Sequence, residues 1–363
     1  MIRLIMTKSV KKTKEAKKKI LVIGYGGTIV MVIDPKRKAI VPAKNLEEIM
    51  QFIPRLHEMA NIKMELLSNK DSTNITPEDW ARLAQYVYSK HDQYDGFVIT
   101  HGTNTMAYTA SALALSLGRG LKKPVVITGS QLPLMVYGND ARFNFENAVK
   151  VAVIASEMKV AEVMIVFDDL ILRGARSAKV SESAFRAFES PAFPELGRIT
   201  STGIHFGSLV QYADPKEKLE LKNLFRTDVV SMDLTPGQLP NVMEALAFSG
   251  KCRGIILKSH GAGSVPTEGP YSFIPFIRRM HEEYKIPVIV ATKFLGGNAY
   301  KEVNDEPAVM AIEAGAIPGG DLTDVMTEVK LMWILGQGVT EQNAVKKMLL
   351  TSYVGEVSEF KKS

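Results

Sequence analysis

The amino-acid sequence predicts an α/β fold with a larger N-terminal domain, built on a mostly parallel sheet flanked by helices, and a smaller C-terminal α/β domain. Short apolar runs alternate with helical patterns along the chain, which is typical of parallel strands joined by crossover helices. The chain has 363 residues, and 46% of them are hydrophobic. It is therefore long enough to bury the cores of about two domains.

The candidate strands fall into two groups, which are separated by a polar stretch with few strand-forming residues. The first group comprises residues 20–24, 63–67, 96–100, 124–128 and 162–168, and the second comprises 228–234, 254–259 and 287–292. The polar stretch between the groups predicts an interdomain linker. In chain order, the predicted units are an N-terminal tail (1–19), a first domain (20–205), the linker (206–227), a second domain (228–355) and a C-terminal tail (356–363).

Two helices have clear sequence signals. Thr76 can cap the first of them, Pro77 suits its first helical position, and Asp79 stands at the capping-box offset. The apolar residues of this helix share one face and are Trp80, Leu83, Ala84 and Val87. The second helix is predicted over residues 106–117, because these are mostly helix formers that follow a strand and a tight turn.

The positive charge of the chain is concentrated at its N-terminus. Residues 1–19 contain eight lysines and arginines against the single acidic Glu15, a net charge of +7. Subtracting this from the total of +6 leaves the rest of the chain at −1. We therefore expect a solvated, disordered tail, or one that attaches weakly to anionic partners, and no specific nucleic-acid surface.

The composition also indicates the compartment. Cys252 is the only cysteine, which excludes a disulfide framework and favours a reducing environment. No apolar stretch reaches the roughly 18 residues of a membrane span. The basic tail is not followed by the apolar segment of a secretory signal, and with Arg3 as its only arginine it is a poor mitochondrial transit peptide. A cytoplasmic protein is expected.

Several common functional patterns are absent or incomplete. The segment Gly24-Tyr25-Gly26-Gly27 resembles the start of a dinucleotide fingerprint, Gly-x-Gly-x-x-Gly, but the last glycine of that pattern is missing. The sequence contains neither a phosphate-binding Gly-Lys-Ser/Thr loop nor a Gly-x-Ser-x-Gly elbow. The six histidines have no metal-ligand spacing. His101 follows an apolar run and precedes a glycine, so we expect it to hydrogen-bond a turn rather than to act as a base. No metal or cofactor is predicted.

Two strand ends carry threonines beside glycines. The strand at 96–100 leads into His101-Gly102-Thr103-Asn104-Thr105-Met106, and the strand at 20–24 leads into Gly26-Gly27-Thr28-Ile29. In each case hydroxyl groups stand at a turn after a strand, where backbone N–H groups point outward. Two such threonines suggest nucleophilic hydroxyl chemistry.

These two segments and three others, in this order along the chain, resemble the sequence blocks of bacterial-type L-asparaginases, especially the cytoplasmic (type I) class and its archaeal relatives. The resemblance extends from about residue 19 to residue 356. The five blocks are Gly26–Ile29, Asp71–Trp80, His101–Met106, Arg173–Lys179 and Glu313–Thr323. It implies an asparaginase-type fold, hydrolysis of L-asparagine to L-aspartate and ammonia without a cofactor, and a homodimer or homotetramer.

The resemblance also implies roles for individual residues. Thr28 is expected to be the nucleophile, and Thr103, Lys179 and Asn104 stand at the positions of a proton relay. Backbone N–H groups of Gly27 and Thr103 are expected to stabilise the oxyanion, a contribution of roughly 3–4 kcal/mol per donor in a good case. Ser72 and Thr73 are expected to bind the substrate α-carboxylate. The full expected substrate-binding set is Asp71, Ser72, Thr73, Gly27 and Gly102.

The chain departs from the family pattern at two places. Asn104 replaces an aspartate that binds the substrate ammonium group and orients the lysine, and an amide is neutral. The lid that follows the first threonine carries a tyrosine in the family, whereas residues 29–45 contain no Tyr, Ser or Thr; Tyr25 precedes Thr28 and is not expected to replace it. Ser264 stands where cytoplasmic members often have asparagine.

Simpler structural roles remain open for these residues. Thr28 could cap a helix, Lys179 could be a surface lysine, Ser72 could belong to a turn, and Asp140 is expected to be a helix cap.

Other functions also remain open. The chain could be an impaired asparaginase-like protein that only binds amino acids. It could also be the amidase subunit of a tRNA-dependent amidotransferase, which is less expected because only 19 residues precede the first predicted strand.

Overall fold

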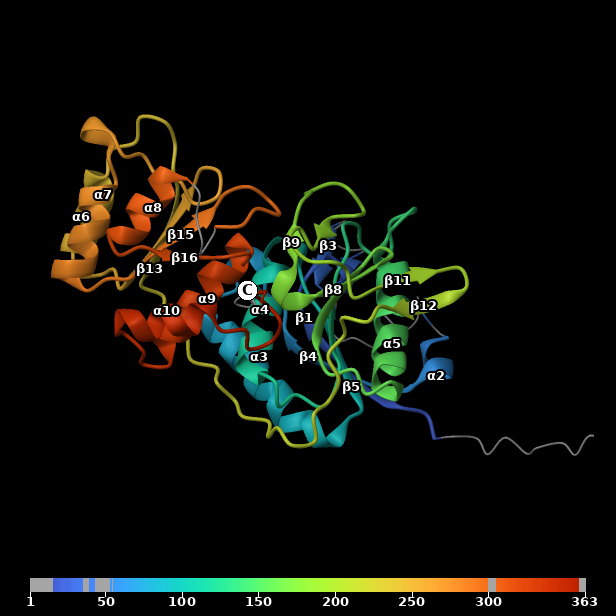
Figure 1. The fold of residues 1–363 in the computed structure, drawn as a ribbon. Helices are drawn as coiled ribbons and strands as arrows, with labels where there is room; N and C mark the ends of the chain where they lie inside the picture. Colours follow the sequence, from blue (N-terminus) through green and yellow to red (C-terminus); the bar gives the residue numbers. More distant parts are fainter. Residues whose placement is uncertain (1–15, 35–38, 43–52, 54, 300–304, 359–363) are drawn as a thin grey trace, which may run out of the picture.

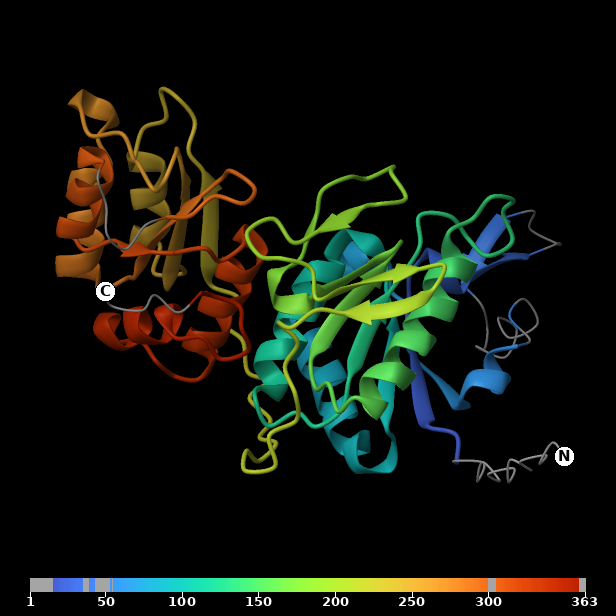
Figure 2. The ribbon, with the colours of Figure 1, turned by 45° about the vertical axis from the view of Figure 1, so that its right-hand side comes forward.

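The computed structural model describes residues 16–34, 39–42, 53, 55–299 and 305–358, which form two large sheets with helices on both faces and two small two-stranded sheets, β2-β3 and β9-β10 (Figures 1 and 2). The larger sheet has eight strands in the order β12-β11-β8-β7-β6-β5-β1-β4. Neighbouring strands from β4 to β7 are parallel, and β8, β11 and β12 continue the sheet antiparallel. Its strands are β1 (Lys19–Tyr25), β4 (Asn61–Ser68), β5 (Gly96–Thr100), β6 (Val125–Thr128), β7 (Val163–Phe167), β8 (Leu170–Arg173), β11 (Gly197–Thr200) and β12 (Gly203–Phe206).

Helices cover both faces of the central strands. Successive side chains of a strand point to opposite faces, so each strand contributes residues to both layers. Leu21 and Ile23 of β1 pack toward α3 and α4, whereas Ile20 and Val22 pack toward α2 and α5. All four side chains are fully buried. The covering helices are α2 (Leu56–Met59), α3 (Pro77–Lys90), α4 (Met106–Leu117) and α5 (Ala141–Glu157).

The smaller sheet has four parallel strands in the order β13-β14-β15-β16. Its strands are β13 (Val229–Asp233), β14 (Gly254–Ser259), β15 (Val288–Thr292) and β16 (Ile317–Pro318), and the helices of this half are α6 (Asn241–Phe248), α7 (Ile274–Arg279), α8 (Glu306–Glu313), α9 (Asp324–Gly336) and α10 (Gln342–Leu350). Helix α9 contacts both β14 and α4, so it packs between the two sheets (Figure 1). In the described part of the chain, no helix is long and apolar enough to cross a membrane.

The predicted fold class is confirmed, and each predicted strand is present with its ends within two residues of the expected ones. Helix α3 starts at the expected capping box of Thr76 and Asp79, and α4 spans the expected residues. The sequence missed short or antiparallel strands. These are β2 (Met31–Asp34), β3 (Ala39–Pro42), β8, β9 (Ala178–Lys179), β10 (Phe188–Glu189), β11, β12 and β16.

The first sheet begins inside the predicted N-terminal tail. Strand β1 starts at Lys19, whose backbone N–H donates to Asp95 Oδ2 at 2.8 Å. The carbonyl of Lys18 accepts a hydrogen bond from the Asn61 N–H, also at 2.8 Å. The predicted tail of residues 1–19 therefore extends too far, since its last two residues pair with their neighbours. Residues 1–15, which hold most of it, lie outside the described residues.

This difference predicts different effects for two N-terminal deletions. Removing residues 1–15 is expected to leave the melting temperature unchanged and to lower the isoelectric point. Removing residues 1–19 also removes the bonds of Lys18 and Lys19, and should lower the melting temperature by about 2–4 °C or more. Differential scanning calorimetry of both proteins tests this. Equal destabilisation by the two deletions would show that residues 1–15 contribute to the fold.

The predicted C-terminal tail also begins too early. Glu356, its first residue, is fully buried and forms an ion pair with Lys330 of α9 at 2.7 Å. Lys330 is fully buried as well and donates to the carbonyls of Leu349 and Thr351. A buried cation requires a counter-charge, which Glu356 supplies. The chain is therefore packed at least as far as this residue.

Glu356→Gln is expected to destabilise the protein by about 3–5 kcal/mol, because it leaves the Lys330 charge buried without its carboxylate. Urea-induced unfolding followed by circular dichroism measures the change. Glu195→Gln is a suitable control, because it breaks an exposed ion pair. The side chains of Glu195 and its partner Arg198 are 37% and 47% exposed, so the substitution should cost less than about 1 kcal/mol. Similar effects of both substitutions would contradict the assignment of a structural charge to Glu356.

Candidate active site

A pocket of about 220 Å³ opens at the carboxyl ends of β1, β4 and β5, where open parallel sheets place their ligand sites. Three loops that follow these strands form most of it, and Lys179 of β9 also lines it. The residues that line the pocket are Gly27, Thr28, Met31, Asp71, Ser72, Gly102, Thr103, Asn104, Gln131, Lys179 and Glu182. The structure thus brings together eight of the nine site residues expected from the sequence. The ninth, Thr73, is hydrogen-bonded to Asn104.

The three loops approach one another so closely that two of their positions require glycine. Gly27 has φ +89°, and a Cβ atom there would lie 2.5 Å from the backbone nitrogen of Gly102. A Cβ atom at Gly102 would in turn lie 2.5 Å from Ser72 Oγ. Backbone groups of the β1 and β5 loops are therefore exposed to the same small volume, as an oxyanion site requires.

Thr28 is the first residue of a 3-10 turn over Thr28–Val30 and is half-buried at the pocket wall. The cap position of this turn is Gly27, and no side chain caps it. Thr28 therefore does not cap this turn, and the simpler helix-capping role does not apply to it. Thr28 lines the same pocket as Gly102 and Thr103.

Lys179, Thr103 and Asn104 form a continuous hydrogen-bonded group. The Lys179 Nζ donates to Thr103 Oγ1 at 2.9 Å and to Asn104 Oδ1 at 3.0 Å. The Asn104 Nδ2 donates to Thr73 Oγ1 at 3.2 Å. Asn104 therefore uses both ends of its amide, the oxygen toward the lysine and the nitrogen toward the loop after β4. Lys179 is not a free surface lysine.

Burial lowers the pKa of the Lys179 amine, and the negative charge of Glu182 acts against this shift. A lower pKa increases the neutral fraction of the amine at a given pH, and only the neutral amine can accept a proton. The group is thus suited to exchange protons with the Thr103 hydroxyl. With asparagine at position 104, the neighbour that accepts from the ammonium group at 3.0 Å carries no charge.

The loop after β4 is fixed to the loop after β5. Ser72 is buried, and its carbonyl accepts from Thr105 Oγ1 at 2.7 Å. Asp71 Oδ1 accepts from the Thr73 N–H at 2.8 Å and caps the turn over Ser72–Asn74. Ser72 and Asp71 do therefore belong to a turn, but one that forms a wall of the pocket. Thr105 was missed in the sequence, although it lies within the same block as Thr103.

Gln131 was also missed, and it holds the loop after Lys179 in place. Its Nε2 donates to the carbonyls of Glu182 and Ala184 at 2.8 and 2.9 Å. Its backbone N–H donates to the carboxylate of Asp140, which was expected to cap α5. Asp140 does stand at the start of that helix, but no side-chain cap bond forms, since its oxygens accept from the 131–132 backbone and from Asn144. No local sequence pattern indicated these contacts.

Two residues near the pocket have structural roles. His101 is fully buried, with Nδ1 against the Gly102 carbonyl at 2.7 Å and Nε2 against Thr109 Oγ1, and burial lowers its pKa to about 4. It therefore bonds the turn, as expected, and is uncharged at neutral pH. Tyr25 is buried, and its hydroxyl donates to the Asp79 carbonyl. Of the predicted lid over 29–45, Met31 lines the pocket, and positions 35–38 and 43–45 lie outside the described residues.

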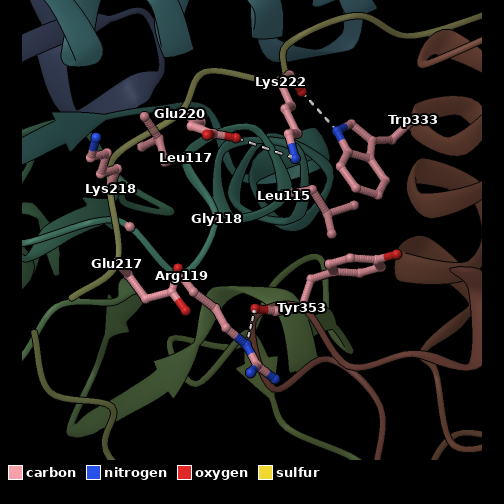
Figure 3. A pocket seen from close by; sticks show the side chains of 11 residues that line it. Leu115, Leu117, Gly118, Arg119, Glu217, Lys218, Glu220, Lys222, Trp333 and Tyr353 are labelled. Atoms are coloured by element: carbon pink, nitrogen blue, oxygen red, sulfur yellow. Dashed lines mark hydrogen bonds and ion pairs between the residues drawn. The ribbon is translucent and has the colours of Figure 1, made fainter. Parts of the chain in front are cut away.

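A second cavity, of about 250 Å³, lies between the end of α4, the 217–222 segment and the chain after α10 (Figure 3). Several of its polar groups are bonded to one another: Trp333 Nε1 donates to the Lys222 carbonyl, the Lys222 amine is paired with Glu220, and Arg119 donates to the Tyr353 carbonyl. None of the expected site residues lines it. Within the described residues, no cluster of His, Cys, Asp and Glu could hold a metal ion.

Comparison with known proteins gives consistent matches over nearly the whole chain. A family model described as "Asparaginase, N-terminal" matches residues 19–212, and one described as "Glutaminase/Asparaginase C-terminal domain" matches residues 228–349. The chain is 33% identical over 343 residues to the L-asparaginase of Thermococcus kodakarensis, which covers 94% of this chain and 99% of that protein.

Two further similarities bear on the fold and on the range of activities. The solved structure of the thermostable L-asparaginase from Thermococcus kodakarensis matches with a TM-score of 0.85 at 31% identity, covering 94% of this chain and all of that one. A glutamyl-tRNA(Gln) amidotransferase component from Pyrococcus abyssi is 32% identical over 350 residues, which cover 94% of this chain and 77% of that protein.

Proposed function

The chain belongs to the asparaginase family of amidohydrolases, and on that premise we propose that it hydrolyses L-asparagine to L-aspartate and ammonia with Thr28 as the nucleophile. The observation that carries the proposal is the meeting of Thr28, Thr103 and Lys179 around one pocket, with Lys179 bonded to Thr103 at 2.9 Å. A hydroxyl nucleophile needs a neighbouring group that takes its proton, and this group supplies one.

The proposed reaction proceeds through a covalent ester. Thr28 Oγ attacks the carbon of the side-chain amide and loses its proton, which the Thr103–Lys179 pair passes to the leaving nitrogen. Ammonia departs, and an aspartyl ester remains on Thr28. Water then attacks the ester carbon, L-aspartate leaves, and the proton returns to Thr28.

Backbone donors stabilise the tetrahedral intermediates of both steps. The N–H groups of Gly27 and Thr103 belong to two loops that come within van der Waals contact at Gly102. An oxyanion between them gains roughly 3–4 kcal/mol per donor in a favourable geometry. Ser72 and Thr73 hold the α-carboxylate of the substrate, and Asp71 and Gly102 shape the same wall.

Ammonia release from L-asparagine by the purified chain tests the proposal directly. We expect turnover of L-asparagine, with equimolar L-aspartate identified by NMR, and a much lower kcat/KM for L-glutamine. D-asparagine serves as a control for the fixed carboxylate site. No ammonia from L-asparagine, together with binding of L-aspartate in calorimetry, would instead make the chain an amino-acid-binding member of the family.

The amidotransferase relatives support a second candidate function. Their identity to this chain, 32%, is close to that of the L-asparaginases, and their name places them in an assembly that acts on glutamyl-tRNA(Gln). If this chain were part of such an assembly, the isolated protein would release ammonia poorly, and its activity would rise with partner proteins and charged tRNA. Strong turnover of free L-asparagine by the chain alone decides against this candidate.

Family membership also supports a homodimer or homotetramer in the cytoplasm as the working form. Light scattering coupled to gel filtration gives the mass of the assembly directly. Ser264, which hydrogen-bonds Asp305 within its own chain, is a candidate for contact with a neighbouring protomer. Its substitution by alanine should leave the single-chain fold intact.

A further inference from the structure

The pocket has an unusual charge arrangement for an amino-acid substrate. At neutral pH an α-amino acid with a side-chain amide carries both a carboxylate and an ammonium group. Among the described residues that line the pocket, Lys179 is the cation and Asp71 and Glu182 are the carboxylates. Asn104, the direct neighbour of Lys179, is neutral. Within the described part of this chain, the carboxylates at the pocket that can balance an ammonium group are therefore those of Asp71 and Glu182.

Asp71 is already committed to the backbone of its own turn. Its Oδ1 accepts from the Thr73 N–H at 2.8 Å and caps the 3-10 turn over Ser72–Asn74. The same turn presents Ser72 to the pocket, in the region that the proposed function assigns to the substrate carboxylate. A second anion at that wall is poorly placed to attract the opposite end of the same substrate.

Glu182 lines the pocket from a different segment, the loop between β9 and β10. The loop backbone is fixed at this residue, because Gln131 Nε2 donates to the carbonyls of Glu182 and Ala184. Ser181 Oγ accepts from the N–H groups of Ser183 and Ala184, which tightens the same turn. Two independent sets of bonds therefore fix the backbone at Glu182, whose exposed side chain lines the pocket. Its charge reaches the interior, since it raises the pKa of Lys179 against the effect of burial.

We propose that Glu182 is a substrate-binding residue that supplies the counter-charge for the α-ammonium group of an α-amino acid with a side-chain amide, the charge that Asn104 does not provide. The inference rests on the proposed function and deepens it. It makes Glu182 a determinant of specificity, which favours side-chain amides of α-amino acids over the corresponding amides without the amino group. A carboxylate at the rim is screened more than one beside Lys179, so its effect is mainly on binding.

The test compares two substrates that differ only by the amino group, L-asparagine and succinamic acid. Glu182→Gln is expected to raise KM for L-asparagine at least tenfold and to leave kcat/KM for succinamic acid within twofold. Glu182→Asp should recover part of the lost affinity. Glu189→Gln is the matched control, because Glu189 is exposed on β10 of the same hairpin and does not line the pocket. This control variant should change neither KM for L-asparagine nor kcat/KM for succinamic acid.

Calorimetric binding of L-aspartate and succinate gives the same comparison without turnover. Glu182→Gln should weaken L-aspartate at least tenfold and succinate less than twofold. An equal loss for both ligands, or none for either, overturns the proposal. The proposal is also overturned if Asp71→Asn, and not Glu182→Gln, selectively loses affinity for L-aspartate. Asparagine at position 71 can still cap the turn, so this variant changes the charge and keeps the turn. A wild-type protein that neither binds L-aspartate nor hydrolyses L-asparagine overturns the proposed function itself, and is thereby distinguished from a failure of the Glu182 assignment alone.

Discussion

Thr28→Ala is expected to reduce kcat/KM for L-asparagine by roughly 10⁴-fold or more, the scale seen when a covalent nucleophile is removed. No other hydroxyl among the pocket residues stands on the β1 loop, and water alone lacks the positioning that the turn gives to Thr28. The melting temperature should change by only a few degrees, because the half-buried side chain loses a methyl and a hydroxyl at a pocket wall. Steady-state ammonia release and calorimetry measure the two effects.

Two further variants separate a chemical role from a structural one. Thr28→Ser keeps the hydroxyl and should retain measurable turnover, whereas Thr28→Val keeps the shape and should be as inactive as the alanine variant. Thr103→Val is expected to lose less activity than Thr28→Val, since it removes a proton carrier rather than the attacking atom. Retained turnover in Thr28→Val would shift the nucleophilic role to Thr103.

The strands that the sequence predicted are those buried on both faces. Ile20 to Ile23 of β1 form a continuous apolar run because helices cover both sides of the sheet, and such runs are visible without a structure. Strand β8 was missed because the chain reverses at Asp168, which has a positive φ of 53°, and a Leu-rich strand follows after only two residues. The strands β9 and β16 are two residues long, which is too short for a periodic signal.

The ends of the chain were misjudged for a different reason. Polar or charged residues such as Lys18, Lys19 and Glu356 indicate exposed tails in a sequence. Two of them bond through the backbone, and Glu356 is paired with a buried lysine 26 positions earlier in the chain. A local pattern carries no information about either partner. The limits of the predicted linker, 206–227, remain predictions.

The site was predictable where its residues lie in short blocks at strand ends. Thr28, Thr103 and Ser72 follow three strands that are neighbours in the sheet, so a parallel α/β fold brings them to one edge. Gln131 and Glu182 were not predictable in this way. Gln131 follows the neighbouring strand β6, but its contact with the 182–184 loop depends on how two loops of different length pack.

Asn104→Asp is expected to raise kcat/KM for L-asparagine at least tenfold, equivalent to about 1.4 kcal/mol of transition-state stabilisation. The Asn104 oxygen lies 3.0 Å from the Lys179 amine, so a carboxylate there acts at short range on both that cation and the substrate ammonium group. The exposed side chain has nearly the same shape in both forms. The bond to Thr73 can persist, because the threonine hydroxyl can donate to a carboxylate oxygen.

The measurement requires a pH series. Burial lowers the pKa of Lys179, and a carboxylate at position 104 favours the charged amine and raises that pKa. Because the neutral amine accepts the proton, activity rises with pH through the Lys179 pKa, and this rising limb should move to higher pH in the Asp variant, while the maximum increases. Asn74→Asp is the matched control, since it adds the same charge to an exposed position of the neighbouring loop outside the pocket lining, and should leave both limb and maximum unchanged.

The gain from Asn104→Asp should depend on Glu182. If Glu182 already supplies part of the missing charge, the substitution gains more when Glu182 is replaced by glutamine, and we expect its effect on kcat/KM to be at least threefold larger in that background. Four proteins measured at their pH maxima complete this cycle. Equal gains in both backgrounds would mean that the two positions act on different groups. No gain in either would mean that asparagine at position 104 does not limit the reaction.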